Sequence, residues 1–208
     1  MKGEIIVPAG EKEIVYRVKD SKFYGNIFSA DSRDRAQGFI TQIRDRFSDA
    51  THNVNAYRIG QSDEVVEYAD DDGEPSGSSG PPVLQAIKGE GLTNTVVVVS
   101  RYFGGTKLGI GGLIRAYGNT ARKVIHSVEK KRLQLYYKVR AEGTYDKFGT
   151  VLGQVESFGG EIIDTDYSNE GPEVTFYLIP GEYDSLRGAL VEKTGNKVEV
   201  EIESRVYF

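Results

Sequence analysis

The chain has 208 residues, of which 38% are hydrophobic and 27% are charged, as in a soluble globular protein. It has no cysteine, which excludes disulfides and thiolate metal sites. Its first ten residues, MKGEIIVPAG, lack the apolar core of a signal peptide, and its longest aliphatic run, Val96–Val99, is far too short to cross a bilayer. We therefore expect a cytoplasmic protein with no membrane partner.

The net charge of −5 is unevenly distributed along the chain. Residues 1–133 contain 19 Lys/Arg and 17 Asp/Glu, whereas residues 134–208 contain 7 Lys/Arg and 14 Asp/Glu. Such an asymmetry favours two domains with different surfaces. We place them at 1–133 and 134–208.

The N-terminal part predicts a mixed α+β domain. Strands are expected at 3–7, 13–18 and 22–29, followed by a helix from about Asp31, which we expect to be its N-cap. The apolar face of that helix consists of Ala36, Phe39, Ile40, Ile43 and Phe47. Further strands are expected at 53–59 and 64–69.

The next 49 residues, 70–118, contain a first glycine-rich loop, then a helical stretch and a valine-rich strand, and then a second glycine-rich loop at 104–112. The strand ends on Arg101-Tyr102-Phe103 and leads into the second loop. A helix is expected from near Gly111 to Arg132. Its basic residues are Arg115, Arg122, Lys123, Lys130, Lys131 and Arg132, against one acid, Glu129.

The C-terminal part predicts the order βαββαβ of a ferredoxin-like unit. Strands are expected at 133–142, 161–167, 173–179 and 197–207, with helices at 145–158 and 183–193 and a turn at 169–172. Because side chains alternate along a strand, one residue of each aromatic pair, Tyr136-Tyr137 and Phe176-Tyr177, is expected in the core.

Four segments are characteristic of one protein family. They are ATHN at 50–53 with AYR at 56–58, DDGEPSG at 71–77, RYFGG at 101–105 and LGIGGLIRAYG at 108–118. Through them the chain resembles the IMPACT/YigZ family over roughly residues 18–127. The resemblance implies an N-terminal fold like domain 2 of ribosomal protein S5 and a C-terminal fold like a domain of a translation elongation factor.

The same resemblance implies a link to translation. Eukaryotic relatives act in translational control by competing for the protein that activates an initiation-factor kinase. They do so with the help of an extra N-terminal domain, which we expect this chain to lack. The bacterial relatives have no settled activity.

The second glycine-rich loop is a candidate anion site, because loop glycines and a helix N-terminus expose backbone N–H groups. It fits neither the Walker A nor the dinucleotide pattern, and a purely structural turn is the alternative. The candidate anion- or RNA-binding residues are Arg101, Tyr102, Gly104, Gly105, Lys107, Gly109, Gly111, Gly112 and Arg115. Phe103 would complete this face, and Arg122 and Lys123 would extend it. We expect Lys107 and Arg115 to point toward the mouth of the loop.

The acidic loop, Asp70–Glu74, is interpreted as a site scaffold rather than a metal site, because the EF-hand pattern fails, and a solvated acidic turn is the alternative. An ion pair between this loop and Arg101 or Lys107 is expected, so that DDGEP and RYFGG meet in one concave site. The scaffold residues are His52, Asn53, Asp71, Asp72, Gly73, Glu74, Pro75, Ser76 and Gly77. No metal, cofactor or catalytic residue is assigned.

Three classes of function remain open. The leading one is a binding protein of translation or its regulation that contacts RNA, the ribosome or a translation factor through the N-terminal domain. The alternatives are a protein-interaction module with an acidic C-terminal domain, and an enzyme acting on a phosphorylated or anionic small molecule. Since an acidic domain repels phosphates, we expect residues 134–208 to add nothing to RNA binding.

Overall fold

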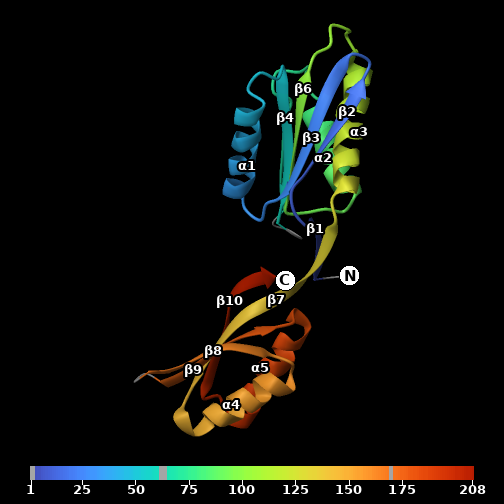
Figure 1. The fold of residues 1–208 in the computed structure, drawn as a ribbon. Helices are drawn as coiled ribbons and strands as arrows, with labels where there is room; N and C mark the ends of the chain where they lie inside the picture. Colours follow the sequence, from blue (N-terminus) through green and yellow to red (C-terminus); the bar gives the residue numbers. More distant parts are fainter. Residues whose placement is uncertain (1–2, 61–64, 169–170) are drawn as a thin grey trace. The chain divides into compact units, whose positions relative to one another are not determined.

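The computed structural model describes residues 3–60, 65–168 and 171–208. These residues form two compact units. The N-terminal unit spans Ile5–Arg132, and the C-terminal unit spans Leu133–Phe208 together with the described residues Gly3 and Glu4. Two strands, β1 (Glu4–Pro8) and β7 (Lys130–Gly143), each cross the boundary between the units. Both units mix helices and strands, which confirms the predicted α+β class (Figure 1).

A five-stranded antiparallel sheet forms the centre of the N-terminal unit, in the order β2-β3-β6-β4-β5. Its strands are β2 (Lys12–Val18), β3 (Ser21–Ser29), β4 (His52–Ile59), β5 (Val66–Asp70) and β6 (Thr95–Tyr102). On the central strand β6, Val96 and Val98 pack on one face, and Val97 and Val99 pack on the other. Both faces of β6 are buried, which explains its uninterrupted run of valines.

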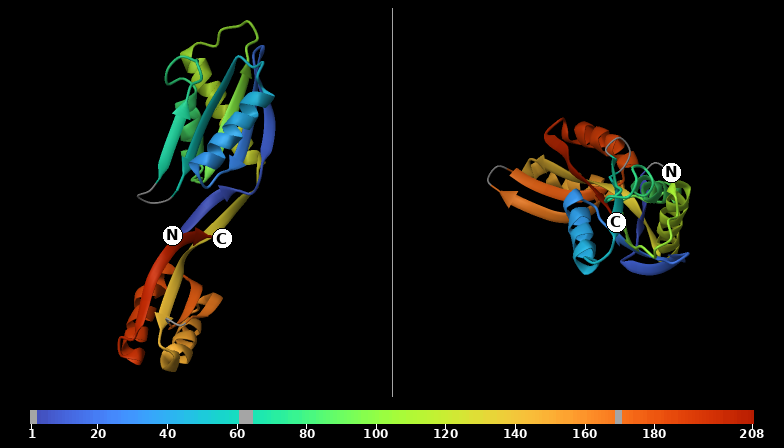
Figure 2. Two further views of the ribbon diagram at one scale, coloured as in Figure 1. Left: turned by 90° about the vertical axis from the view of Figure 1, so that its left-hand side faces the viewer. Right: turned by 90° about the horizontal axis from the view of Figure 1, so that it is seen from above.

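Helices cover both faces of this sheet. Helix α1 (Arg33–Arg46) lies on one face, toward the viewer in the left panel of Figure 2, and α2 (Gly80–Gly89) and α3 (Ile110–Ser127) lie on the other (Figure 1). At Gly25 of β3, a Cβ atom would lie 2.9 Å from a methyl group of Thr120 on α3. Glycine therefore allows this helix to pack close to the sheet.

Two helix boundaries differ from the prediction. The N-cap of α1 is Ser32, whose Oγ accepts a hydrogen bond from the Arg35 amide, while Asp31 accepts one from the Arg35 side chain. Helix α3 ends at Ser127 because Val128 has extended backbone angles (φ −100°, ψ 144°). As a result, residues 130–132 belong to β7 rather than to the basic helix.

The C-terminal unit has the predicted βαββαβ order. Its elements are β7, α4 (Tyr145–Ser157), β8 (Glu161–Ser168), β9 (Gly171–Leu178), the short helix η2 (Pro180–Glu182), α5 (Tyr183–Thr194) and β10 (Val198–Tyr207). The strands pair antiparallel as β10-β7-β9-β8, the arrangement of a ferredoxin-like sheet. Of the predicted turn at 169–172, residues 169–170 lie outside the described residues, and β9 begins at Gly171; Glu64 of the strand predicted at 64–69 also lies outside them.

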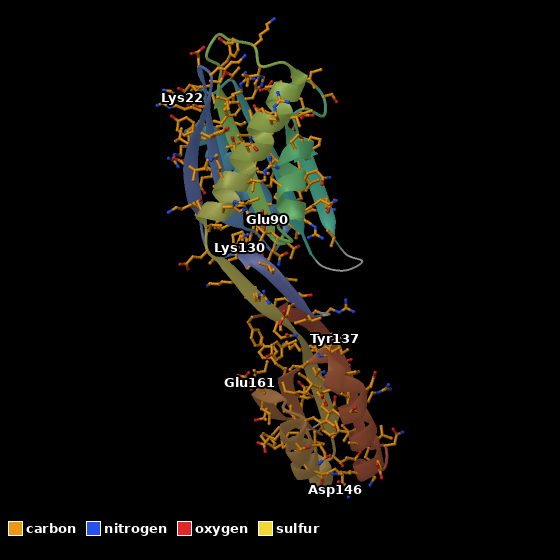
Figure 3. All side chains as sticks on the ribbon, turned by 90° about the vertical axis from the view of Figure 1, so that its right-hand side faces the viewer. Lys22, Glu90, Lys130, Tyr137, Asp146 and Glu161 are labelled. Carbon is orange, nitrogen blue, oxygen red and sulfur yellow. The ribbon has the colours of Figure 1, made fainter. Side chains whose placement is uncertain are left out.

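The two helices of this unit pack on one face of its sheet. Phe148 of α4 and Leu186 of α5 share a core with Phe176, and Tyr137, labelled in Figure 3, packs against it. One residue of each predicted aromatic pair therefore contributes to the core, as expected. The other two, Tyr136 and Tyr177, both contact the ring of Phe208. Among the described helices, none is long and apolar enough to cross a membrane.

Candidate functional site

The acidic loop between β5 and α2 is held by hydrogen bonds to its own carboxylates. Asp71 accepts hydrogen bonds from three backbone amides, those of Gly77 (2.7 Å), Ser79 (2.8 Å) and Gly80 (2.8 Å). Asp71 thus places a negative charge at the N-terminus of α2, where the helix dipole favours it.

The next aspartate anchors the loop to β4 and α1. Asp72 accepts from the Asn53 amide at 2.6 Å and from the Arg44 guanidinium at 2.9 Å. Arg44 also pairs with Asp70 at 3.1 Å. These carboxylates are committed to protein donors, and within the described residues no group of His, Asp and Glu is placed to hold a metal ion.

The loop then places Glu74 in the interior. Its Oε1 accepts from Arg101 Nη1 at 2.6 Å and from the Tyr117 hydroxyl at 2.7 Å. The side chains of Glu74 and Arg101 are only 4% and 6% exposed, and Tyr117 is fully buried. Burial, followed by the hydrogen bond to Glu74, raises the pKa of Tyr117, so the phenol stays protonated and donates.

Arg101 lies between aromatic rings. Its guanidinium carbon is 5.5 Å from the ring centre of Phe23 and 5.3 Å from that of Phe103. Its Nε is buried and has no hydrogen-bond partner within the part of the chain that the structure describes. A buried ion pair gains little net stability because desolvation offsets the attraction, so stability alone does not account for this pair.

His52 completes the group. Its Nδ1 is 2.7 Å from the backbone carbonyl oxygen of Asp72, which can only accept, so Nδ1 carries a proton and donates. In the neutral ring, Nε2 then has a free lone pair. This atom is 3.9 Å from Glu74 Oε2, too far for a hydrogen bond.

His52, Glu74 and Arg101 line a cavity of about 440 Å³, which we call the Glu74 cavity. Its walls come from the loop before α2, the end of β6 and the start of α3. The lining residues are Thr51, His52, Glu74, Pro75, Arg101, Phe103, Lys107, Leu108, Gly109, Ile110 and Leu113. The expectation that DDGEP and RYFGG meet in one concave site therefore agrees with the structure.

The glycines of the second loop have two different roles. A Cβ atom at Gly104 would lie 2.1 Å from the backbone of Asp20, so this glycine lets the loop approach the β2–β3 hairpin, not a ligand. Gly105 and Gly109 have φ of 88° and 72°, angles that glycine adopts without strain. Gly111 and Gly112 belong to the first turn of α3.

Lys107 and Arg115 do not share one mouth, contrary to expectation. Lys107 lines the Glu74 cavity, whereas Arg115 lines a separate hollow of about 270 Å³. The reason is the helical period. Leu113, which faces the cavity, and Arg115 are two residues apart and hence about 200° apart around α3.

The second hollow lies between the β2–β3 hairpin and α3, and we call it the basic hollow. Its lining residues are Tyr16, Val18, Lys19, Leu108, Gly112, Arg115, Ala116 and Asn119. Lys123 extends over the ring of Tyr16, with Nζ 5.2 Å from the ring centre, and Arg122 donates to Asn119 at 2.6 Å. The lining contains two cations and no carboxylate.

Tyr102 does not belong to the predicted face. Its hydroxyl donates to Asp49 at 2.5 Å, and its ring contacts Tyr24 and Phe47 on the α1 side of the sheet. The hydrogen bond to Asp49 raises the pKa of Tyr102 to about 12. Since neighbouring residues of a strand point to opposite faces, Tyr102 points away from Arg101.

Other predicted scaffold residues lie nearby without lining the cavity. Asn53 contributes its backbone amide to Asp72, and Gly73 (φ 84°) lies next to the His52 ring. Ser76 and Gly77 are exposed. Four cavity residues were not predicted, namely Thr51, Leu108, Ile110 and Leu113, and neither was Tyr117, which hydrogen-bonds to Glu74 from the interior. All of these lie within the family segments, but the prediction passed over Thr51 and the apolar and aromatic positions among them.

A larger hollow of about 630 Å³ lies in the C-terminal unit. Its lining includes Glu142, Thr144, Arg187 and Lys197, none of which is buried. We therefore regard the Glu74 cavity, which combines apolar walls with buried charges, as the better candidate for a ligand site.

Known proteins resemble this chain in the region that contains both hollows. The family model of the Impact N-terminal domain matches residues 19–125, which include both the Glu74 cavity and most of the basic hollow. A crystal structure of a hypothetical protein covers 98% of this chain and 99% of its own, with a TM-score of 0.70 and 24% identity. That likeness shows a shared fold.

Three relatives illustrate the range of sequence similarity. IMPACT family member YvyE of Bacillus subtilis (strain 168) is 34% identical over 92% of this chain and 87% of its own. IMPACT family member YigZ of Escherichia coli (strain K12) is 29% identical over 78% of this chain and 80% of its own. Protein IMPACT-B of Xenopus tropicalis is 28% identical over 51% of this chain and 37% of its own. The chain belongs to the IMPACT family.

Proposed function

We propose that the chain is a cytoplasmic binding protein of translation or its regulation, and that its N-terminal unit contacts RNA at the basic hollow. The observation that carries this proposal is the cluster of Lys19, Arg115 and Lys123 around Tyr16, with no carboxylate in the lining. Phosphate groups pair with such cations, and the polar Asn119 and the Tyr16 ring offer further contacts to a nucleotide chain.

Family membership supports the same proposal, since the relatives implied by the resemblance act in translational control. The charge difference between the two parts of the chain also supports it, because the acidic C-terminal part repels phosphates. We do not assign RNA binding to the Tyr136, Tyr177 and Phe208 cluster for that reason.

The test is RNA binding by the full chain as a function of salt. The variant Lys19→Ala/Arg115→Ala/Lys123→Ala should lower the affinity for a single-stranded RNA at least about tenfold, and its log–log salt slope should be shallower by roughly 2, at about 0.7 per lost phosphate contact. All three side chains are exposed, so the fold should be retained.

The matched control removes the same charge from the other unit. Lys147→Ala/Arg187→Ala/Lys193→Ala should bind RNA like the parent protein, because these residues belong to α4 and α5. Equal losses in both triple variants would contradict the proposal and would reduce the effect to net charge alone. Unchanged RNA binding in the first variant would instead favour a protein-interaction module.

A further inference from the structure

We propose that the Glu74 cavity binds a small organic phosphate that carries a hydrogen-bond donor, of about the size of a nucleoside monophosphate. The cavity, at about 440 Å³, lies within the range of about 300–1,000 Å³ that is usual for small-molecule sites. It is distinct from the basic hollow, so the proposal does not depend on RNA binding there.

The first argument is that the start of α3 can bind a phosphate group. The N-cap Gly109 has no side chain to cap the helix, and the first intrahelical bond runs from the Leu113 amide to the Gly109 carbonyl. The amides of residues 110–112 therefore lack intrahelical acceptors. Lys107 lines the same cavity and is exposed, so it adds a mobile positive charge beside these amides.

A second, independent observation concerns the cavity floor. Arg101 lines the cavity, its side chain is 94% buried, and its Nε has no partner among the described residues. An unpaired buried donor costs free energy, which a small movement of the Arg101 side chain toward a bound acceptor would relieve. The pairing of Glu74 with Arg101 leaves this floor close to neutral, so it does not repel an anion at the mouth.

The position of the ligand's hydrogen-bond donor follows from His52 and Glu74. His52 Nε2 in the neutral ring and Glu74 Oε2 are both acceptors, and they face each other across 3.9 Å. A hydroxyl or amino group placed between them can lie at hydrogen-bond distance from both. Inorganic phosphate has no donor separate from the phosphate group itself, which is why we assign the site to a phosphorylated compound with its own hydroxyl or amino group.

The remaining wall fits a flat or apolar part of the ligand. Phe103 and Ile110 are 45% and 62% exposed, although both line the cavity, and Leu108 and Leu113 lie beside them. A planar base can stack on the open side of the Phe103 ring, whose other neighbour is the Arg101 guanidinium.

The test uses calorimetric titration of the full chain with four probes: AMP, ribose 5-phosphate, adenosine and inorganic phosphate. AMP should bind most tightly, because it alone supplies the phosphate, the donors and a planar group. Lys107→Ala should weaken the binding of AMP about tenfold and leave the binding of adenosine unchanged, since a charge-assisted hydrogen bond to phosphate is lost. His52→Gln should weaken the binding of AMP and ribose 5-phosphate and leave the binding of inorganic phosphate unchanged.

Two matched variants serve as controls. Lys12→Ala removes an exposed lysine on β2, and His126→Gln removes the other histidine, which lies on α3 outside the cavity. Both should bind AMP like the parent protein. The proposal is overturned if no phosphorylated probe binds with a Kd of about 1 mM or tighter, or if the control variants lose AMP binding as much as Lys107→Ala.

The same phosphate could belong to a free nucleotide or to the end of an RNA chain. RNA oligomers with a 5′-phosphate and with a 5′-hydroxyl distinguish these sources in competition with AMP. Displacement by the phosphorylated oligomer alone identifies an RNA end, and displacement by neither identifies a free nucleotide. The triple variant of the basic hollow should keep AMP binding, so the two proposals can fail separately.

Discussion

Two arginines, one in each unit, pair with carboxylates but differ in their environment. Arg101 is buried beside Glu74 in the N-terminal unit. Arg140 lies on the face of the C-terminal sheet that the helices leave open, 2.7 Å from Glu173 and 2.8 Å from Glu201. The hydrogen bonds to these carboxylates, that of Glu173 first, raise the pKa of Arg140 further above its usual range.

Ion-pair distance alone therefore does not predict the role of a pair. Water competes for the Arg140 network, and salt screens it, so it contributes little beyond strand register and solubility. The Arg101–Glu74 pair is buried away from water, so its stability depends on neighbouring groups, which include Tyr117 and the aromatic rings. A pair of that kind, in the floor of a cavity, constrains which ligands can enter.

Leaving one of these charges without its partner should destabilise the protein most. Arg101→Leu should lower the free energy of unfolding by about 3–5 kcal/mol, because Glu74 would remain buried and unpaired. Arg140→Leu should leave the urea midpoint nearly unchanged. Urea unfolding of both variants measures the contrast. The double variant Arg101→Leu/Glu74→Leu should regain part of the loss; equal losses from Arg101→Leu and Arg140→Leu would show that burial does not decide the role.

A smaller effect is expected at Asp71, a carboxylate that is bound by backbone amides instead of a cation. Asp71→Ala should destabilise the protein by about 1–2 kcal/mol, since it removes an acceptor shared by three amides at the start of α2. Asp45→Ala, at an exposed position on α1, is the matched control. If the two substitutions cost the same, the contacts of Asp71 contribute nothing beyond its charge.

The smallest effect is expected at Glu67, a partly exposed carboxylate of the N-terminal unit. A hydrogen bond from Lys88, at 2.7 Å, is the main cause that lowers the pKa of Glu67 below its usual value. A lowered pKa stabilises the fold at pH above the unfolded value, and this contribution is lost as the pH falls through the folded value. Glu67→Gln should therefore cost a few tenths of a kcal/mol at neutral pH.

Urea unfolding at neutral pH and at about pH 3 checks the Glu67 prediction, because the difference from the parent protein should shrink in acid. Glu11→Gln, at an exposed position before β2, should show no such change between the two pH values. A Glu67→Gln difference that stays constant with pH would mean that the carboxylate charge is not involved.

The elements themselves followed from local patterns. The period of 3.6 placed α1, and the alternation of β10 placed its strand, because each signal lies within a few residues. Local patterns could also have prevented two errors in the predicted site, the placement of Tyr102 and that of Arg115. Alternation on β6 separates Tyr102 from Arg101, and the helical period separates Arg115 from Leu113.

The rest of the site depends on contacts between distant segments. Tyr117 reaches Glu74 across 43 residues, and His52 meets Asp72 across 20. These contacts exist because α3 packs on the sheet and the loop before α2 folds against β4, which no single segment specifies. The same holds for Gly104, whose glycine is required by the backbone of Asp20 and not by its own turn.

Because β6 is the central strand of its sheet, its amide hydrogen exchange can report the opening of the N-terminal unit. Its backbone is paired with β3 on one side and β4 on the other, and its valines are fully buried. Amide protons in such a strand exchange with deuterated water only when the whole unit opens. Exchange at residues 96–99 therefore reads out the global opening of the N-terminal unit, and comparison with exchange at β9 would reveal whether the two units open together or one at a time.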